Sequence, residues 1–302
     1  MIISELLKIT ERKLRDAKIK SARLDAELII ANILQKSREW VLAHDDFKLD
    51  NEALVKIQVD INRRKNREPL AYILGRKEFY GRNFIVNKNV LIPRPETEQV
   101  IDIVKEIVKK GHKINKIVDI GTGSGVIAII LALEFPDVKI IATEKYHEAR
   151  VVAQTNREKF QLQTNRVNIL AANLLKVYIS ATHQKDWLGI NRHRGYYHRL
   201  LQCDMIVANL PYVDKKWNWL DKKTLRFEPR TALFARGRGL KLIKKLIRQA
   251  PDYLRNEGFL ILELDTIQMG EIKRFAAKYN FTTYDEKPFT LTLQKLAKTY
   301  EI

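Results

Sequence analysis

The first seventy or so residues carry apolar side chains at intervals of three and four positions, which is the period of an α-helix. A predicted helix over 3–19 places on one face Ile3, Leu6, Leu7 and Leu14. A second predicted helix, over 22–35, can be capped by Ser21 and is expected to turn inward Leu24, Leu28 and Ile29.

Further helix signals complete this region. A short helix is predicted within 37–45, and Asp50 is placed to cap a longer one over 51–66. Pro69 stands where a fifth helix can begin, because proline suits the first helical turn. Together these segments predict a small N-terminal helical bundle.

The pattern then changes from helical to extended. Residues 77–93 hold Gly81 between aromatic and β-branched side chains, which predicts a β-hairpin linker. A helix is predicted after Pro95, with Gly111 at its end because glycine commonly terminates helices.

From there, apolar strands alternate with amphipathic helices. The predicted strands are 116–120, 139–144, 167–173, 204–209 and 258–264. The predicted helices are 125–135, 147–160, 239–254 and 267–279. This alternation predicts an α/β fold with a parallel sheet that is covered by helices on both faces.

Composition narrows the class of protein. The chain has 302 residues, of which 45% are hydrophobic, so it can bury a sizeable core. Its longest strictly apolar run, 126–133, is too short to cross a bilayer, and the first residues lack a signal-peptide core. Cys203 is the only cysteine and begins an apolar strand, so we expect a core residue and no intrachain disulfide. These features favour a cytoplasmic protein without membrane contact.

The formal net charge is +19, which favours an acidic partner, although a lysine-rich composition by itself gives the same excess. Residues 176–201 are notable because lysines and arginines alternate there with Tyr178, Trp187, Tyr196 and Tyr197. Such side chains can contact nucleic acid through charge and stacking. An ordinary surface loop fits the same residues, and we favour that interpretation.

The segment "VDIGTGSGVIAI" places a glycine-rich turn between a predicted strand and a helix. Glycines allow a tight turn and the close approach of a ligand to the backbone. The next strand ends at Glu144, where a carboxylate can accept hydrogen bonds from both hydroxyls of a ribose. The turn and the acid at this separation predict a site for S-adenosylmethionine. The turn comprises Gly121, Thr122, Gly123, Ser124 and Gly125.

Three more side chains are predicted to lie near this cofactor. Asp119 precedes the turn and can orient it by accepting backbone N–H bonds. Asn173 and Leu174 end the third strand, where the adenine ring is expected, so the amide can meet the edge of the ring and the leucine its face. Each of these residues also suits an ordinary strand end.

The fourth strand ends in "NLPY", residues 209–212, beside the glycine turn in a sheet of this kind. The Asn209 side-chain oxygen and the Leu210 backbone carbonyl can hold the two hydrogens of an amide or aromatic amine and aim its lone pair at a sulfonium methyl. Pro211 stiffens the turn, and Tyr212 can stack on the planar acceptor. Asn209 thus borders both cofactor and acceptor. This chemistry needs neither a metal nor a strong base.

With these motifs placed, the chain resembles the release-factor glutamine methyltransferases of the HemK/PrmC type. The resemblance runs from about residue 20 to 271, and its combination of motifs is specific. The segments that carry it are "LDAELIIANIL", "REPLAYILGRKEFYG", "LIPRPETE", "VDIGTGSGVIAI", "VANLPYV", "RFEPRTALFARGRGL" and "GFLILELDTIQMGE".

The resemblance implies a class I S-adenosylmethionine-dependent methyltransferase domain, Rossmann-like, over 93–302. It implies a helical substrate-recognition domain over 1–75 and a hairpin linker over 76–92. The implied reaction is methylation of the side-chain amide nitrogen of the glutamine in the Gly-Gly-Gln loop of peptide-chain release factors. By the same resemblance, the glycine turn and Glu144 hold the cofactor and residues 209–212 hold the glutamine. We expect a monomer.

The resemblance also brings Arg94, Glu96 and Glu98 of "LIPRPETE" near the active site. The chain departs from the family at Leu210, where the family has proline, and at Asn173, where it usually has aspartate. The tail lacks the family's Gly-Asp-x-Arg pattern. Two alternatives therefore stay open: an adenine N6-methyltransferase of ribosomal RNA or DNA, and a non-catalytic methyltransferase homologue that binds RNA or the ribosome.

Overall fold

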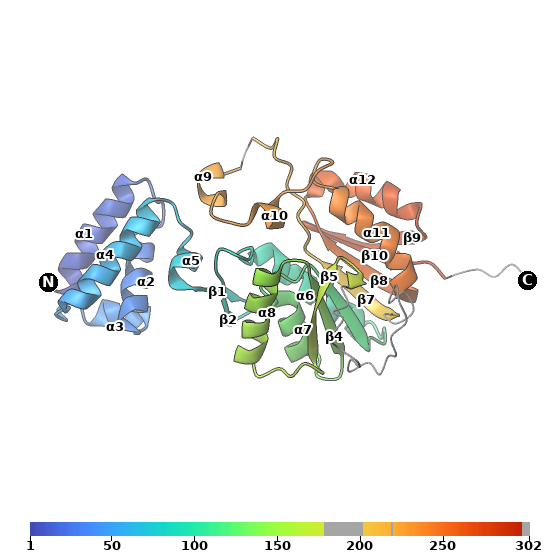
Figure 1. Ribbon diagram of the computed structural model, residues 1–302, viewed down its shortest axis with the longest axis horizontal. Helices are drawn as coiled ribbons and strands as arrows, with labels where there is room; N and C mark the ends of the chain where they lie inside the picture. The colour runs from blue at the N-terminus through green and yellow to red at the C-terminus, as the bar shows by residue number, and fades with distance from the viewer. Residues whose placement is uncertain (178–201, 219, 298–302) are drawn as a thin grey trace, which may run out of the picture. The chain divides into compact units, whose positions relative to one another are not determined.

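The computed structural model describes residues 1–177, 202–218 and 220–297 (Figure 1). They form two compact units. The first contains 1–77, 86–88 and 220–227, and the second contains the remaining described residues. The first unit therefore takes a short segment from the second half of the chain. The assignment of substrate recognition to residues 1–75 stays a prediction.

The first unit is helical, as the apolar spacing predicts. Its helices are α1 (Ile3–Asp16), α2 (Ala22–Leu34), α3 (Arg38–Ala43), α4 (Asn51–Lys65), α5 (Leu70–Leu74) and α9 (Lys222–Leu225). Ile3 and Leu14 of α1 pack with Ile29 of α2 and Ile57 of α4 in one buried cluster. The predicted bundle is confirmed.

Two predicted details of this unit need correction. Asp50 caps α4 as expected, because its side chain accepts the Ala53 N–H at 2.7 Å. Ser21 occupies the cap position of α2 but makes no side-chain cap, since its ψ of 26° departs from the extended backbone typical of capping residues. Leu24, expected inside, is 42% exposed. The buried stripe of α2 instead runs through Ala22, Ala26, Ile29 and Ile30.

The hairpin forms as predicted, from β1 (Arg76–Phe79) and β2 (Arg82–Ile85). Tyr80 and Gly81 make its two-residue turn, and both have positive φ, at 52° and 71°. Turns of this kind match the twist of the paired strands. Asn156 of α8 (His147–Lys159) holds the end of β2, because its side chain accepts from the Ile85 N–H at 2.7 Å and donates to the Ile85 carbonyl at 2.9 Å.

The second unit is built on a sheet with the order β6-β5-β4-β3-β7-β8-β10-β9. The five predicted strands all form, and they run parallel to one another. The strands are β3 (Lys116–Ile120), β4 (Lys139–Glu144), β5 (Val167–Asn173), β6 (Lys176–Val177), β7 (Cys203–Ala208), β8 (Leu254–Glu263), β9 (Phe281–Lys287) and β10 (Thr290–Lys295).

The sheet is mixed rather than wholly parallel. β6 pairs antiparallel with β5, and β10 pairs antiparallel with both β8 and β9. Short turns cause two of these pairings, because a tight turn between neighbouring strands permits only an antiparallel ladder. The tail thus forms two strands although it departs from the family pattern.

Helices cover both faces of the sheet, as the alternation predicts. Neighbouring strand residues point to opposite faces, so Ile117, Ile140 and Val207 join one cluster while Val118 and Ile206 join the other. The first cluster includes side chains from α6 (Glu98–Lys109), α7 (Val126–Glu134) and α8, and the second from α11 (Lys241–Tyr253) and α12 (Thr266–Ala277).

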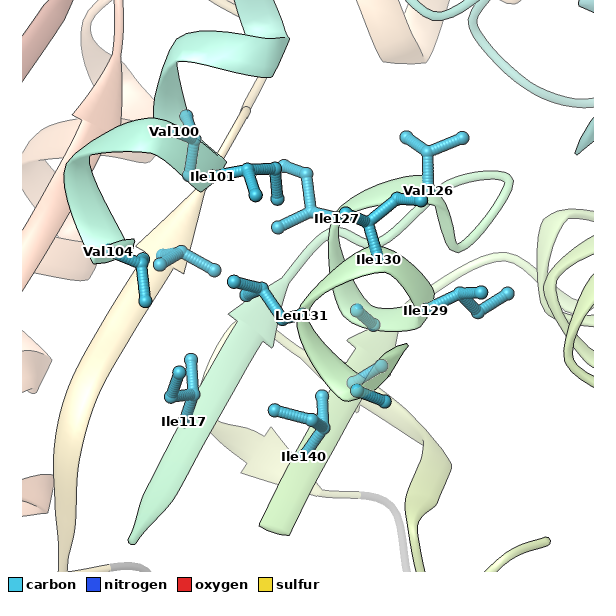
Figure 2. Packing of buried hydrophobic residues seen from close by; sticks show 14 of the residues in the cluster. Val100, Ile101, Val104, Ile117, Val126, Ile127, Ile129, Ile130, Leu131 and Ile140 are labelled. Carbon is cyan, nitrogen blue, oxygen red and sulfur yellow. The ribbon is translucent and has the colours of Figure 1, made fainter. Parts of the chain in front are cut away.

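Figure 2 shows the first of these clusters from close by. Ile101 of α6 extends toward Ile127 of α7, and Ile117 and Ile140 lie on the strands beneath. α7 is buried on all sides because it lies between the sheet and two other helices. This burial explains why its sequence contains the longest apolar run in the chain.

Cys203 is a core residue, as predicted. It is fully buried at the start of β7, and its thiol donates to the Tyr253 carbonyl at 3.4 Å. Burial raises the pKa of Cys203 to about 12, which keeps the thiol protonated and unreactive.

The strand order brings three strand ends together. β3 lies between β4 and β7, and Ile120 pairs with Thr143 on one side and Ala208 on the other. From β3 the chain builds outward first through β4 and β5, and then on the other side through β7 and β8. Such a switch point opens a crevice at the carboxyl ends of the strands. Within the described part of the chain, no helix combines the length and apolar character needed to cross a membrane.

Candidate active site

The glycine turn follows β3 directly and leads into α7. Gly121, Gly123 and Gly125 all have positive φ, at 73°, 57° and 85°. A side chain at Gly125 would lie 3.1 Å from Ile129 and 3.3 Å from Ala153, so this glycine allows α7 and α8 to pack closely. At Gly123 the space is open, with its nearest neighbour at 3.9 Å. The turn therefore offers bare backbone to a ligand at Gly123.

The end of β4 holds this turn in place. The Thr143 carbonyl accepts the N–H groups of Gly121 and Thr122 at 2.8 and 3.0 Å. Glu144, 8% exposed, accepts the Gly123 N–H at 3.1 Å and the Tyr146 N–H at 2.9 Å. A carboxylate has about four lone-pair positions, so two can still accept ribose hydroxyls. The turn and Glu144 thus fit the adenosyl part of S-adenosylmethionine.

Asp119 differs in detail from its expected role. Its Oδ2 accepts the Thr122 hydroxyl at 2.6 Å, whereas the carbonyl of Thr143 and the Glu144 carboxylate take the N–H groups of the turn. Burial raises the pKa of Asp119 to about 7, although the bond from Thr122 lowers it. Asp119 therefore contacts the turn through the Thr122 side chain, and a hydrogen bond with the Ala128 backbone also lowers its pKa. Its role in orienting the turn stays a prediction.

The remaining cofactor residues lie at the next strand end. Asn173 is the last residue of β5 and is partly exposed. Leu174 follows with a φ of 57° and packs into the core at 7% exposure. Ser124 of the turn is buried at 3% exposure, and its carbonyl accepts from Asn156. The structure thus places Asn173 at the carboxyl end of β5, while the roles of all these residues stay predictions.

The "NLPY" segment begins where β7 ends, as predicted. Leu210 is buried at 4% exposure, and a side chain at Gly121 would come within 3.0 Å of its Cδ2 atom. Leu210 therefore packs against the glycine turn, which brings the expected acceptor site next to the expected cofactor site. Pro211 and Tyr212 continue the segment, and the Tyr212 carbonyl accepts from Gln268 at 2.9 Å.

Two side chains that sequence reasoning did not single out complete this cluster. Thr97 accepts the side-chain N–H of Asn209 at 3.0 Å, and Glu263 accepts the Tyr212 hydroxyl at 3.3 Å. Thr97 and Glu263 are 2% and 1% exposed. Each lies within a quoted motif, "LIPRPETE" or "GFLILELDTIQMGE", so a buried polar residue inside a motif was the available signal.

Burial dominates the electrostatics of this cluster. It raises the pKa of Glu263 to about 7, although hydrogen bonding from Thr97 and Tyr212 lowers it. Burial and the nearby Glu263 charge raise the pKa of Tyr212 well above its usual range. Glu96 contributes to both upward shifts, which places its charge near this site as the resemblance implies.

The "LIPRPETE" segment also meets the segment after β7. Arg94 donates to Glu228 at 2.6 Å, and the other Glu228 oxygen accepts the Ile92 N–H at 3.1 Å. Glu98 accepts the Tyr80 N–H at 2.8 Å, which connects it to the hairpin turn rather than to Asn209. Of the predicted basic segment 176–201, all but β6 lies outside the described residues.

Comparison with known proteins finds a matching family model in each of the two units. A family model described as the PrmC N-terminal domain matches residues 5–75, and one described as the methyltransferase small domain matches residues 101–186. Among solved structures, the hMettl16 catalytic domain in complex with a MAT2A 3'UTR hairpin is similar in fold, with a TM-score of 0.50 and 15% identity over 84% of each chain.

Curated relatives named release factor glutamine methyltransferase match most of the chain. The Buchnera aphidicola protein is 32% identical and covers 93% of this chain and 92% of its own length. The Coxiella burnetii protein is 35% identical over 81% of this chain and 79% of its own length, and the Escherichia coli protein is 33% identical over 85% and 83%. At this identity and coverage, the chain belongs to the release factor glutamine methyltransferase family.

Proposed function

We propose that this protein methylates the side-chain amide nitrogen, N5, of the glutamine in the Gly-Gly-Gln loop of peptide-chain release factors. S-adenosylmethionine is the methyl donor, and when bound it supplies a methyl group on a positively charged sulfur. We also propose that the protein acts as a monomer in the cytoplasm and that residues 1–75 recognise the release factor.

One observation carries the choice of an amide acceptor. Asn209 stands beside the glycine turn with its Nδ2 bonded to Thr97 at 3.0 Å. Among the described residues its Oδ1 accepts no hydrogen bond, so this oxygen is available to a substrate N–H. An acceptor beside a methyl-donor site is what an amide needs, because its lone pair is delocalised and must be aimed.

The residues of this chain position the acceptor and supply no strong nucleophile. Asn209 Oδ1 and the Leu210 carbonyl accept the two amide hydrogens, and the Tyr212 ring, held by Glu263, packs on the amide plane. The N–CH₃ bond forms as the S–CH₃ bond breaks, and the amide nitrogen then releases one proton. Fixed orientation of the acceptor is the main contribution of these residues.

The test uses S-adenosylmethionine with a labelled methyl group. The substrates are a cognate release factor, a release factor whose loop glutamine is replaced by alanine, and ribosomal RNA. Label on the intact release factor alone, mapped by mass spectrometry to the glutamine side chain, is the expected result. Label on RNA instead would replace the proposal with base methylation, and would make residues 176–201 a candidate RNA contact.

Asn209→Ala tests the acceptor role. We expect kcat to fall by roughly 100-fold or more, since a preorganised polar contact to the reacting group is lost. Cofactor affinity, measured by calorimetry, should change little. Asn168→Ala, at another partly buried asparagine on β5, is the matched control. Equal turnover in the Asn209 and Asn168 variants would contradict the assigned role.

A further inference from the structure

Gln268 lies where three backbone segments of the second unit meet. It belongs to the first turn of α12 and is 5% exposed. Its side-chain NH₂ group donates to the Tyr212 carbonyl and to the Arg238 carbonyl, both at 2.9 Å. Its Oε1 accepts the Asp265 N–H at 3.2 Å. One buried side chain thus joins the "NLPY" segment to the turn before α11 and to the start of α12.

The partners of Gln268 permit only one orientation of its amide. A backbone carbonyl can only accept a hydrogen bond, and a backbone N–H can only donate one. In the reversed orientation, the side-chain oxygen would face two carbonyls and the NH₂ group would face the Asp265 N–H, so all three hydrogen bonds would be lost. The surrounding backbone therefore directs the two donors of Gln268 at Tyr212 and Arg238.

α12 is a firm base for this contact. Its residue Met269 is buried in the same cluster as Leu210. The Asp265 side chain caps the helix, and the bond between Gln268 and the Asp265 N–H completes a capping box. Because α12 is held at its start and along its buried face, the bond from Gln268 restricts the position of the Tyr212 backbone.

The Tyr212 carbonyl is also enclosed by the turn before α11. A side chain at Gly239 would lie 1.9 Å from the Tyr212 oxygen and 2.7 Å from Gln268 Nε2, so this contact requires a glycine at position 239. At its other end, the Tyr212 hydroxyl donates to Glu263 at 3.3 Å. Tyr212 is therefore held at both ends, through its carbonyl by Gln268 and through its hydroxyl by Glu263.

We propose that Gln268 is a positioning residue for methyl transfer. By holding the Tyr212 carbonyl, it fixes the backbone from which the Tyr212 ring extends toward the substrate amide. This inference rests on the proposed function, in which that ring packs on the glutamine side chain. Gln268 spends its donors and its acceptor on backbone groups, so it contributes to the rate through Tyr212 rather than through contact with the reacting atoms.

The experiment removes both donors with Gln268→Met, which keeps an unbranched side chain of similar length. Release-factor methylation is measured at saturating cofactor, and cofactor titration gives the concentration of folded enzyme. We expect kcat to fall roughly 10- to 100-fold, because a small misplacement of a group that orients the substrate carries losses of this size. The cofactor Kd and the KM for release factor should be unchanged.

Gln249→Met is the matched control. Gln249 lies on α11, and its side-chain oxygen is buried without a hydrogen-bond partner among the described residues. We expect this variant to keep the kcat of the wild type. If Gln268→Met were as active as Gln249→Met, the proposal would be overturned.

Gln268→Glu separates positioning from helix capping. A glutamate can still accept the Asp265 N–H as in a capping box, but in neither protonation state can it supply two donors to the Tyr212 and Arg238 carbonyls. We expect the same loss of kcat as in Gln268→Met. A wild-type kcat in Gln268→Glu would overturn the proposal, and this variant takes the place of Gln268→Met if the latter does not fold.

The Tyr212 ring can be observed independently of catalysis. The protein is labelled with 3-fluorotyrosine, and the ¹⁹F NMR signal of Tyr212 is assigned by its loss in Tyr212→Phe. This signal should shift or broaden in Gln268→Met and stay unchanged in Gln249→Met. An unchanged signal in Gln268→Met would count against the proposal, because Tyr212 would then have kept its position. If the wild type did not methylate release factor while the signal moved as expected, the proposed function would fail and the contact between Gln268 and Tyr212 would stand.

Discussion

At the residue scale, the side chains of the site take their roles from where strands end. Glu144 ends β4 and Glu263 ends β8, and both carboxyls are more than 90% buried. Glu144 accepts backbone N–H groups from a turn, whereas Glu263 accepts a phenol hydroxyl. The same residue type thus supports the glycine turn in one place and the Tyr212 side chain in the other.

Glu144→Ala should weaken cofactor binding. The substitution removes the expected ribose acceptor and also the partner of the Gly123 N–H, so the turn loses its support. Charge-assisted hydrogen bonds contribute about 1.5–3 kcal/mol each, so we expect roughly a 10- to 100-fold higher Kd by calorimetry. Glu148→Ala, at an exposed glutamate on α8, is the control. An unchanged Kd in the Glu144 variant would contradict its assignment.

The raised pKa of Glu263, about 7 against an ordinary 4.5, makes the stability of the protein depend on pH. Burial is the main cause, hydrogen bonds from Thr97 and Tyr212 oppose it, Glu96 adds to it and Arg94 opposes it. Between these two pKa values the folded state binds more protons than the unfolded state. Stability therefore falls as pH rises through about 7.

Glu263→Gln tests this dependence of stability on pH. The variant should be stabilised relative to wild type at pH 8 but not at pH 5, with a difference on the order of 2–3 kcal/mol. Thermal unfolding at both pH values measures it. Glu257→Gln, at an exposed glutamate on β8, should show no such difference. A pH-independent effect of Glu263→Gln would show that its carboxyl does not titrate in this range.

At the scale of elements, a turn before α11 meets the acceptor segment backbone to backbone. A side chain at Gly239 would lie 1.9 Å from the Tyr212 carbonyl oxygen, whereas at Gly237 the nearest atom is 3.7 Å away. Both glycines have positive φ, at 84° and 65°. Because the two glycines share a positive φ but differ in this distance, a comparison of their alanine variants measures the effect of the close approach alone.

Gly239→Ala should therefore shift the Tyr212 backbone, and Gly237→Ala should not. Both variants incur the backbone cost of about 1–2 kcal/mol for a side chain in the left-handed region. Gly239→Ala should lose further stability and most of its kcat, since Tyr212 is displaced. Denaturant unfolding and methylation assays on the pair measure this. Equal losses of stability and kcat in the two variants would mean that the close approach at Gly239 does not matter for activity.

At the scale of the whole molecule, an ion pair with a buried carboxylate joins distant motifs within the second unit. Arg94 and Glu228 are 134 positions apart, and the Glu228 side chain is 1% exposed. "LIPRPETE" and "RFEPRTAL", which both carry the family resemblance, each supply half of this contact.

Arg94→Leu should lower the free energy of unfolding by about 3 kcal/mol, because it leaves a buried carboxylate without its cation. The double variant Arg94→Leu/Glu228→Gln should recover part of this loss. Arg238→Leu, in an exposed pair with Glu271, is the control, with an expected loss of at most about 1 kcal/mol. Denaturant titration of all three variants gives the values. Equal losses for Arg94→Leu and Arg238→Leu would contradict the importance of burial.

The sequence by itself determined the elements and the glycine turn. Apolar spacing predicted the helices and the five parallel strands, because burying apolar surface on both faces of a sheet requires that pattern. Gly121, Gly123 and Gly125 were recognisable because few other residues adopt their backbone conformation. Glu144 and Asn209 were recognisable because a polar residue ends an apolar strand.

Only the tertiary structure decided the contacts between segments far apart in the chain. Thr97, Glu263 and Glu228 look like ordinary helix, strand and loop residues in the sequence, and each acquires its role from a partner more than fifty positions away. The antiparallel strands beyond β8 were likewise missed, since no local pattern records which strand a tail will join. Local patterns record the burial of each residue's own element, whereas hydrogen bonds between buried polar groups depend on which elements meet.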